Sequence, residues 1–326
     1  MSYHLVRPSS LQPIIEPRNK IEWESKGLFN PTVQYVNDEH VMYYRTFPEE
    51  VTKFFDNESG RYRLQNQTSL IGRATSPDGI NFRLESNPWL AGDVEYETGG
   101  VEDPRLSIIG NKQYVTYTAI KGAISGEKNN PEIRIAIAEV VGGQPKKMGR
   151  LPGGLHSKAG ALFKSGEKTY FIYTQNPDRT NSVIKVVEID SVDELVSSSE
   201  WINRSITLLA SSDLHHRGPE LGAVPILTKY GWLLIFSNES MGRQWTVGAA
   251  ILDVDNPTKL LARTSGRILE PVLDWELMGN VPCVTFPSGA VVKGDQLIVY
   301  YGAADTVVGM ALGSLEKLVE SMESVK

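Results

Sequence analysis

The sequence has a single cysteine, Cys283, in 326 residues. An intrachain disulfide is therefore impossible, which is typical of proteins in a reducing compartment, and we expect Cys283 to pack as a small apolar side chain. The first residues carry no apolar run like that of a secretory signal. No stretch approaches the roughly 18 apolar residues of a membrane span. We therefore expect a cytoplasmic protein with no membrane partner.

An excess of positive charge is also lacking. The chain has 33 Lys and Arg against 39 Asp and Glu, for a formal net charge of −6, whereas nucleic-acid-binding domains usually carry a basic excess. We therefore expect no nucleic-acid partner. Helical patterns are scarce, and only Val192–Ser197 and Leu315–Met322 favour short helices. We treat residues 1–326 as a single domain because no linker or shift in composition divides them.

What the sequence does contain is an internal repeat. Each copy has a segment with Gly or Pro entering a strand, a polar turn, and a second strand rich in Tyr, Ile, Val and Phe. These features predict a β-hairpin. The copies span residues 29–46, 101–119, 157–175, 220–238 and 285–303.

A hairpin cannot bury both of its faces alone, so the copies must pack against one another. Weaker strand patterns between the copies would complete blades of about four strands; they are Ser69–Ala74, Ile133–Val140, Ser182–Glu188 and Thr246–Leu252. We predict an all-β, five-bladed β-propeller with a short C-terminal helix. A β-sandwich built from similar hairpins is the alternative. Residues 121–130 are expected to form a long loop, which in a homo-oligomer could reach a neighbouring copy.

Polar residues stand where strands of the copies begin or end. If the blades close in register, these groups converge on one end of a central channel. The acids are Asp103, Glu220, Glu239 and Asp305, and the bases are Arg45, Arg105 and Lys158. Separated carboxylates suit glycoside cleavage, in which one protonates the leaving oxygen and another activates water. A surface turn at Asp103-Pro104 and a solvated loop at His215-His216 remain open at this point.

No metal site is expected, because the chain has only 5 histidines and none has zinc-ligand spacing. No Gly-rich phosphate loop stands between a strand and a helix either. We therefore expect no cofactor.

Several segments in order resemble glycoside hydrolase family 130, the β-mannoside phosphorylases and β-1,2-mannosidases. They are Gly100-Val101-Glu102-Asp103-Pro104-Arg105, Ser76-Pro77-Asp78-Gly79-Ile80-Asn81-Phe82, Gly231-Trp232-Leu233-Leu234-Ile235, Phe286-Pro287-Ser288-Gly289-Ala290 and Tyr300-Tyr301-Gly302-Ala303-Ala304-Asp305-Thr306. The resemblance covers nearly the whole chain and implies a five-bladed propeller. It implies that Asp103 is the catalytic acid, acting through a sugar hydroxyl, and that Asp305 contacts the sugar. We assign Asn30, Arg45, Arg105, Lys158 and His215 to substrate binding as well.

Two departures from the family pattern concern phosphate. Where its phosphorylases carry His-Arg-Pro and Tyr-His-Gly, this chain has Thr174-Gln175-Asn176 and Phe236-Ser237-Asn238. Each charge-assisted hydrogen bond lost to phosphate costs roughly 1.5–3 kcal/mol. Glu220 and Glu239 add negative charge, as in the family's hydrolases. We therefore predict an inverting hydrolase that releases mannose from β-linked, preferably β-1,2-linked, manno-oligosaccharides, with Glu220 as the first choice of base and Glu239 as the second.

Other functions stay open. In a β-mannoside phosphorylase, which forms mannose 1-phosphate, inorganic phosphate would be the co-substrate, and Arg179 with His215-His216-Arg217 would supply substitute cations. A non-catalytic sugar-binding propeller is a further alternative. A furanosidase-type propeller is disfavoured because Phe29-Asn30-Pro31 lacks the acid needed in the first copy. Either glutamate could instead serve only in an ion pair with Arg217 or Arg243.

Overall fold

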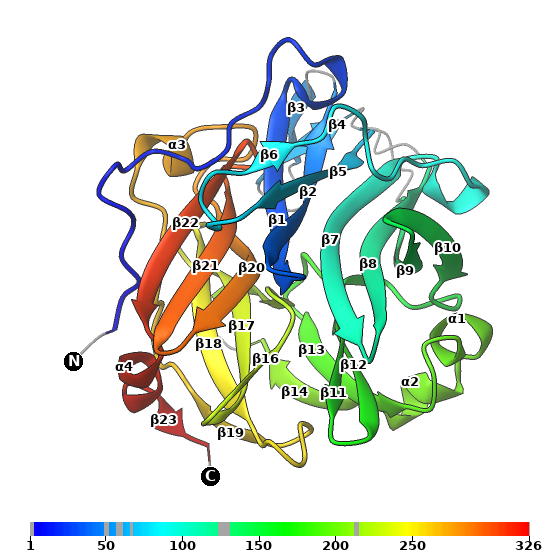
Figure 1. Cartoon of the computed structure of the whole chain (residues 1–326), viewed down its shortest axis with the longest axis vertical. Helices are drawn as coiled ribbons and strands as arrows, with labels where there is room; N and C mark the ends of the chain where they lie inside the picture. The colour runs from blue at the N-terminus through cyan, green and yellow to red at the C-terminus, as the bar shows by residue number, and fades with distance from the viewer. Residues whose placement is uncertain are drawn as a thin grey trace.

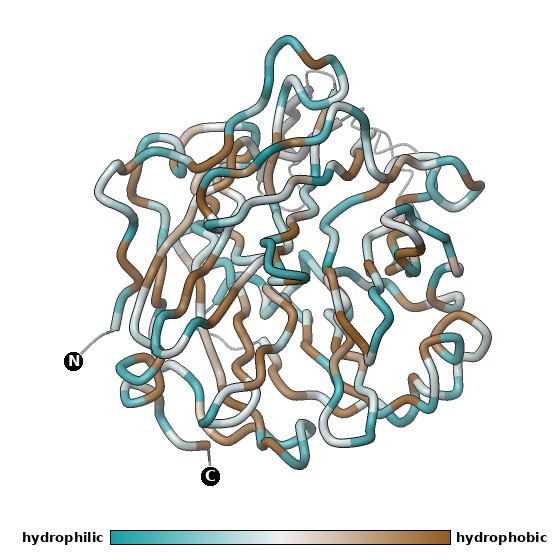
Figure 2. Tube along the Cα trace, viewed as in Figure 1, coloured by the Kyte–Doolittle hydropathy of each residue, from teal (hydrophilic) through white to brown (hydrophobic). Residues whose placement is uncertain are grey.

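The computed structural model describes residues 3–48, 52–56, 61–65, 68–122, 131–211 and 215–325. Five antiparallel sheets surround a common centre (Figure 1), as the repeat predicts for a five-bladed β-propeller. In Figure 1, β1, β7 and β20 lie near this centre, whereas β10 and β22 lie farther out. Figure 2 shows hydrophobic residues along the strands and hydrophilic ones at many of the turns.

The blades follow one another along the chain. Blade one contains β1 (Gly27–Val36), β2 (Glu39–Phe47), β5 (Leu70–Ser76) and β6 (Arg83–Leu84). Blade two contains β7 (Gly100–Ile109), β8 (Lys112–Lys121), β9 (Glu132–Val141) and β10 (Gln144–Arg150). Blade three contains β11 (Ser157–Ser165), β12 (Lys168–Gln175), β13 (Val183–Ile189) and β14 (Ile206–Ala210).

Blades four and five complete the ring. Blade four contains β15 (His215–Leu221), β16 (Ile226–Thr228), β17 (Gly231–Ser240), β18 (Trp245–Leu252), β19 (Leu260–Arg263) and the C-terminal β23 (Glu323–Ser324). Blade five contains β20 (Thr285–Lys293), β21 (Gln296–Ala303) and β22 (Val307–Ser314). The short helices are η1 (Glu22–Glu24), η2 (Glu95–Glu97), α1 (Glu194–Ser197), α2 (Glu200–Arg204), α3 (Asp274–Leu277) and α4 (Leu315–Glu320).

The predicted hairpins, weaker strands and both predicted helices are all present. Turn residues adopt the left-handed backbone that tight hairpins require: φ is 49° at Asn37, 62° at Gly110, 58° at Gly166 and 60° at Gly294. In blade four the predicted hairpin is divided, because the strand before the turn is split into β15 and β16.

The hydrophobic core is divided among the interfaces between blades. Each of five buried apolar clusters draws its side chains from two neighbouring blades, and the cluster containing Val33, Met42 and Tyr300 joins blade five to blade one. The blades therefore bury their faces against one another, which closes the ring.

The N-terminal segment completes blade five, a feature that the sequence repeat does not reveal. Val6 and Ile15 pair with Leu312 and Val308 of β22. The Arg7 guanidinium also binds both carboxylate oxygens of the buried Glu276, at 2.6 and 2.7 Å. The N-terminal segment is thus tied to β22 by backbone pairing and to Glu276 of α3 by a partly buried ion pair.

A second hairpin, β3 (Thr52–Asp56) with β4 (Arg61–Gln65), is inserted between β2 and β5 and was also not predicted. Most of the predicted loop 121–130 lies outside the described residues. In the part of the chain that the structure describes, no helix is long and apolar enough to cross a membrane.

Candidate active site

The first strand of every blade contains a bulge at the same place. The pairing register with the second strand slips between Phe29 and Thr32, Glu102 and Arg105, Lys158 and Ala161, Arg217 and Glu220, and Phe286 and Gly289. We call the residue before each slip the pre-bulge residue and the next one the bulge residue. The bulge residues Asn30, Asp103 and Ala159 have φ values of 47°, 51° and 47°. Asn and Asp tolerate this left-handed backbone best among residues with a Cβ.

The bulges bring Asn30 and Asp103 together. Asn30 Nδ2 donates to Asp103 Oδ1 at 2.8 Å, and Arg45 Nη1 lies 3.5 Å from the same oxygen. Lys158 Nζ lies 4.0 Å from the other carboxylate oxygen, Oδ2. Asp103 is therefore at a junction of blades one, two and three, as a residue facing the central axis should be.

Glu102, the pre-bulge residue of blade two, links the two cations beside Asp103. Its carboxylate accepts a hydrogen bond from Arg45 Nη2 and lies 3.3 Å from Lys158 Nζ. Arg45 Nε also donates to Ser69 Oγ at 3.0 Å. Because Glu102 is 1% exposed, this pairing holds Arg45 and Lys158 in place and satisfies a carboxylate that burial would otherwise disfavour.

The two aspartates of the site have opposite pKa shifts. Burial raises the pKa of Asp103, but Arg45, Lys158 and the hydrogen bond from Asn30 together lower it by more than burial raises it. The pKa of Asp103 therefore lies below its usual value. Burial raises the pKa of Asp305 to about 7; Arg45 opposes this rise and Asp103 adds to it. In the free protein Asp103 is thus ionised at neutral pH, and Asp305 is the carboxyl group that can hold a proton there.

Blade four contributes the other two predicted carboxylates. Glu220 Oε1 accepts a hydrogen bond from the Asp178 backbone at 2.7 Å, and Glu239 Oε2 lies 3.3 Å from Arg217 Nε. Arg217 also donates to the Asp178 carbonyl at 3.0 Å, and the Asp178 carboxylate lies 3.9 Å from Lys158. Asp178 therefore connects the Asp103 group with Glu220 and Glu239. The ion pair of Glu239 with Arg217 is one of the alternatives that the sequence left open.

Arg105 occupies a different position from the one expected of a substrate ligand. It is fully buried and donates to the carbonyls of Pro104 and Asp103, at 2.9 and 3.3 Å, and to those of Leu221 and Gly222. Since blades two and four are not neighbours, the side chain crosses the central axis. Burial lowers the pKa of its guanidinium to about 10. Its donors serve backbone carbonyls, so the geometry gives it a structural contact in place of the predicted sugar contact.

His215 begins β15 opposite Ser240, and burial and the positive charge of Arg263 lower its pKa. Its assignment to substrate binding stays a prediction. Within the described ranges, no three His, Cys, Asp or Glu side chains are arranged to hold a metal ion.

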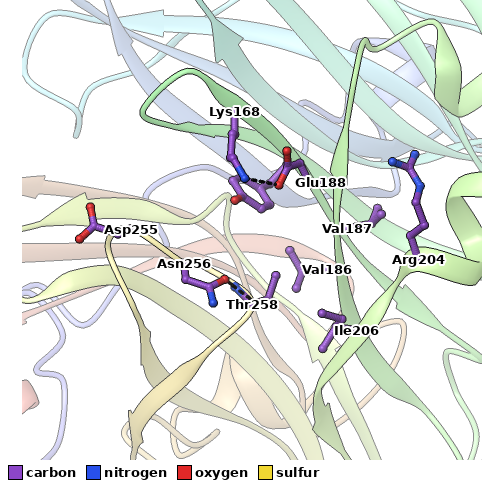
Figure 3. A pocket seen from close by; sticks show the side chains of 10 residues that line it. Lys168, Val186, Val187, Glu188, Arg204, Ile206, Asp255, Asn256 and Thr258 are labelled. Atoms are coloured by element: carbon purple, nitrogen blue, oxygen red, sulfur yellow. Dashed lines mark hydrogen bonds and ion pairs between the residues drawn. The ribbon is translucent and has the colours of Figure 1, made fainter.

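An outer groove of about 510 Å³ between blades three and four lies apart from these residues (Figure 3). Two of its cations are already paired, Lys168 with Glu188 at 2.9 Å and Arg204 with Glu194. None of the predicted site residues lines it.

Sequence reasoning did not assign several residues that the structure brings to the site. They are Ser69, Glu102 and Asp178. Arg217 had been considered only as a substitute phosphate cation or as an ion-pair partner of a glutamate. Glu102 and Arg217 occupy the position in the repeat that Lys158 occupies, so aligning the copies residue by residue would have identified them. Asp178 follows the second strand of its copy, as Asp305 does, and could have been found by the same comparison.

The family model and the most similar characterised proteins point to the same family. Residues 7–324 match the model of glycoside hydrolase family 130, described as β-1,4-mannooligosaccharide phosphorylase. A β-1,2-mannobiose phosphorylase of Thermoanaerobacter sp. (strain X514) is 33% identical over 97% of this chain and 99% of its own length. A 1,2-β-oligomannan phosphorylase of the same organism is 31% identical over 92% of this chain and 94% of its own length.

Solved structures agree on the fold. The β-1,2-mannobiose phosphorylase of Listeria innocua in complex with β-1,2-mannobiose has a TM-score of 0.77 at 24% identity, over 97% of this chain and 98% of that one. A structure from work on family members that hydrolyse β-1,2 mannosidic linkages in Candida mannan has a TM-score of 0.76 at 22% identity, over 97% and 95%. The family relatives include phosphorylases, and the expected hydrolase is not confirmed. The chain belongs to glycoside hydrolase family 130.

Proposed function

We propose that this protein is a β-mannoside phosphorylase that cleaves β-1,2-linked manno-oligosaccharides with inorganic phosphate. The observation that carries the proposal is the likeness over nearly the full length to a β-1,2-mannobiose phosphorylase, at 33% identity. The placement of Arg45 and Lys158 beside Asp103 supports it, because cations are needed to bring a phosphate anion to the reacting sugar. The proposal replaces the hydrolase that was predicted because the sequence departs from the family's phosphate-binding pattern at two places.

In this reaction a phosphate oxygen attacks the anomeric carbon from the face opposite the leaving sugar. The bond from that carbon to the glycosidic oxygen breaks, the leaving oxygen takes a proton, and α-mannose 1-phosphate is released with the shortened saccharide. Asp103 supplies the proton through a hydroxyl group of the bound sugar. Asp103 is ionised in the free protein, so substrate binding must raise its pKa, and removal of water by the sugar acts in that direction.

One observation favours hydrolysis as the second candidate. Glu220 and Glu239 are nearly buried and lie next to Asp178 and Arg217 in the same group of residues. Carboxylates there repel a phosphate dianion and can accept a proton from water. In that reaction Glu220 would activate the water and mannose, in place of mannose 1-phosphate, would be the product.

Product analysis separates the two reactions. The purified protein is incubated with β-1,2-mannobiose, and with β-1,4-mannobiose as a linkage control, in the presence and absence of inorganic phosphate. We expect mannose 1-phosphate to form only with phosphate, and the reverse reaction, from mannose 1-phosphate and mannose, to release phosphate. Release of α-mannose at the same rate without phosphate would instead establish the hydrolase.

Glu220→Gln provides an internal check, with Glu239→Gln as its matched partner. A phosphorylase should retain its rate within about tenfold in both variants, because neither carboxylate takes part in its chemistry. A hydrolase that uses Glu220 as base should lose about 10²–10⁴-fold in Glu220→Gln.

A further inference from the structure

Phe286 occupies the pre-bulge position of blade five. Three of the other four pre-bulge residues, Glu102, Lys158 and Arg217, belong to the charged group around Asp103. The fourth, Phe29, is fully buried. Phe286 is only partly buried, so the repeat places an accessible aromatic ring at a position that elsewhere faces the site.

Two independent sets of contacts place the ring near Asp103. Phe286 pairs with Gly302 on β21, and a Cβ added to Gly302 would lie 2.1 Å from Asn30 Oδ1. Asn30 is therefore packed on the strand beside Phe286 and is itself bonded to Asp103. On the other side, the Arg105 guanidinium carbon lies 6.0 Å from the Phe286 ring centroid, and Arg105 donates to the Asp103 carbonyl.

Two side chains pack near the Phe286 ring. Arg105, whose guanidinium lies near the ring, is fully buried. Trp245 packs on another side, with ring centroids 6.0 Å apart and planes inclined by 60°, and is itself nearly buried. The partly exposed Phe286 ring thus adds an apolar surface near the charged and amide side chains around Asp103.

A mannopyranose ring has an apolar face of C–H groups together with hydroxyl groups at its edge. Carboxylates, amides and cations bind the hydroxyl groups, and an aromatic ring packs against the C–H face. We propose that Phe286 contacts the apolar face of a pyranose ring of the substrate and thereby contributes to sugar binding. This inference rests on the proposed action on mannosides, whether phosphate or water is the acceptor.

The test compares Phe286→Ala and Phe286→Tyr with wild type on β-1,2-mannobiose, with kcat and KM measured separately. Phe286→Ala should raise the KM for mannobiose about tenfold, with a smaller change in kcat, because the contact is made in both the ground state and the transition state. Phe286→Tyr keeps the ring and should stay within about threefold of wild type. Phe82→Ala is the control, because Phe82 is also partly buried but lies next to β6 of blade one and packs against Tyr300 of β21.

A folded Phe286→Ala protein whose KM and kcat/KM stay within about threefold of wild type would overturn the inference. If the alanine variant does not fold, Phe286→Leu decides, because it keeps apolar volume without a planar face and should also raise KM about tenfold. The wild-type measurement shows whether the proposed function or only the inference about Phe286 has failed. A wild-type protein that cleaves no mannoside overturns the proposed function and this inference together, whereas an active wild type with unaffected Phe286 variants overturns only the inference.

Discussion

Asn30 and Asp103 occupy the same bulge position in neighbouring blades, and Asn30 Nδ2 donates a 2.8 Å hydrogen bond to Asp103 Oδ1. The bulge gives both residues a left-handed backbone, with φ values of 47° and 51°. The same position of the repeat, in two neighbouring blades, thus supplies the carboxylate and the amide that orients it. Gly302 leaves the space that Asn30 needs, because a Cβ there would lie 2.1 Å from Asn30 Oδ1.

Asn30→Ala should raise the pKa of Asp103, because the hydrogen bond from Asn30 lowers it. It should also reduce kcat by about tenfold or more, since the carboxylate loses its orienting donor. Gly302→Ala should cause a similar loss by displacing Asn30, and Gly266→Ala serves as its control because a Cβ there meets nothing within 4 Å. NMR titration of labelled aspartate and steady-state kinetics measure the two effects. An unchanged pKa and rate in Asn30→Ala would contradict this role.

Asp305 should make the stability of the protein depend on pH. Its pKa is raised to about 7 in the folded chain, against about 3.9 for an unfolded aspartate. The folded state binds this proton more tightly, so the stabilisation is complete below the unfolded pKa and is lost as pH rises through about 7. In Asp305→Asn, the fall in Tm from about pH 5 to about pH 8 should therefore be smaller than in wild type. Calorimetry at both pH values tests this, and an equal fall in both proteins would refute it.

Lys158→Gln should weaken phosphate binding more than sugar binding. Lys158 Nζ lies 3.3 Å from Glu102, 4.0 Å from Asp103 and 3.9 Å from Asp178, so its loss leaves three carboxylates less compensated. The KM for phosphate should rise about 10–100-fold, as expected for one lost charge-assisted contact. Lys146→Gln, at an exposed lysine of β10, is the control. If the KM for phosphate is unchanged in Lys158→Gln, phosphate does not bind beside this lysine.

Arg7→Ala should destabilise the ring at its closure. The substitution leaves Glu276, which also accepts a 2.7 Å hydrogen bond from the Tyr301 hydroxyl, buried without its cation. Removal of one partner of a buried ion pair costs about 3–5 kcal/mol. The free energy of unfolding, measured in denaturant, should fall by about that amount, whereas Arg83→Ala at an exposed position should change it by less than about 0.5 kcal/mol. A loss in Arg7→Ala as small as that of the control would show that the pair does not hold the ring closed.

The sequence was sufficient to predict the blades because each hairpin carries its own turn and strand chemistry. Asn37-Asp38 and Gly294-Asp295 mark turns locally, and the Tyr- and Val-rich strands that follow them predict the second strand of each blade. The closure of blade five by Val6 and Ile15 could not be read in this way, since pairing between residues about 300 positions apart leaves no local periodic signal.

The site was predictable only in part. Asp103 stands in a family motif and Arg45 and Lys158 stand at blade ends, and the structure brings the three together. Their roles in the reaction stay predictions. Arg105 matched the same motif, yet its side chain turns to the carbonyls of blade four. The direction of a side chain depends on the bulge and on the neighbouring blades, and neither can be deduced from the local sequence.

The most direct test compares mannose 1-phosphate formation by wild type and Asp103→Asn, with β-1,2-mannobiose and with or without phosphate. The account predicts a phosphate-dependent rate in wild type that falls about 10²–10⁴-fold in a folded Asp103→Asn protein. Mannose 1-phosphate formation that survives this substitution at the wild-type rate would contradict the central role of Asp103. Wild-type cleavage that proceeds equally well without phosphate would contradict the phosphorylase.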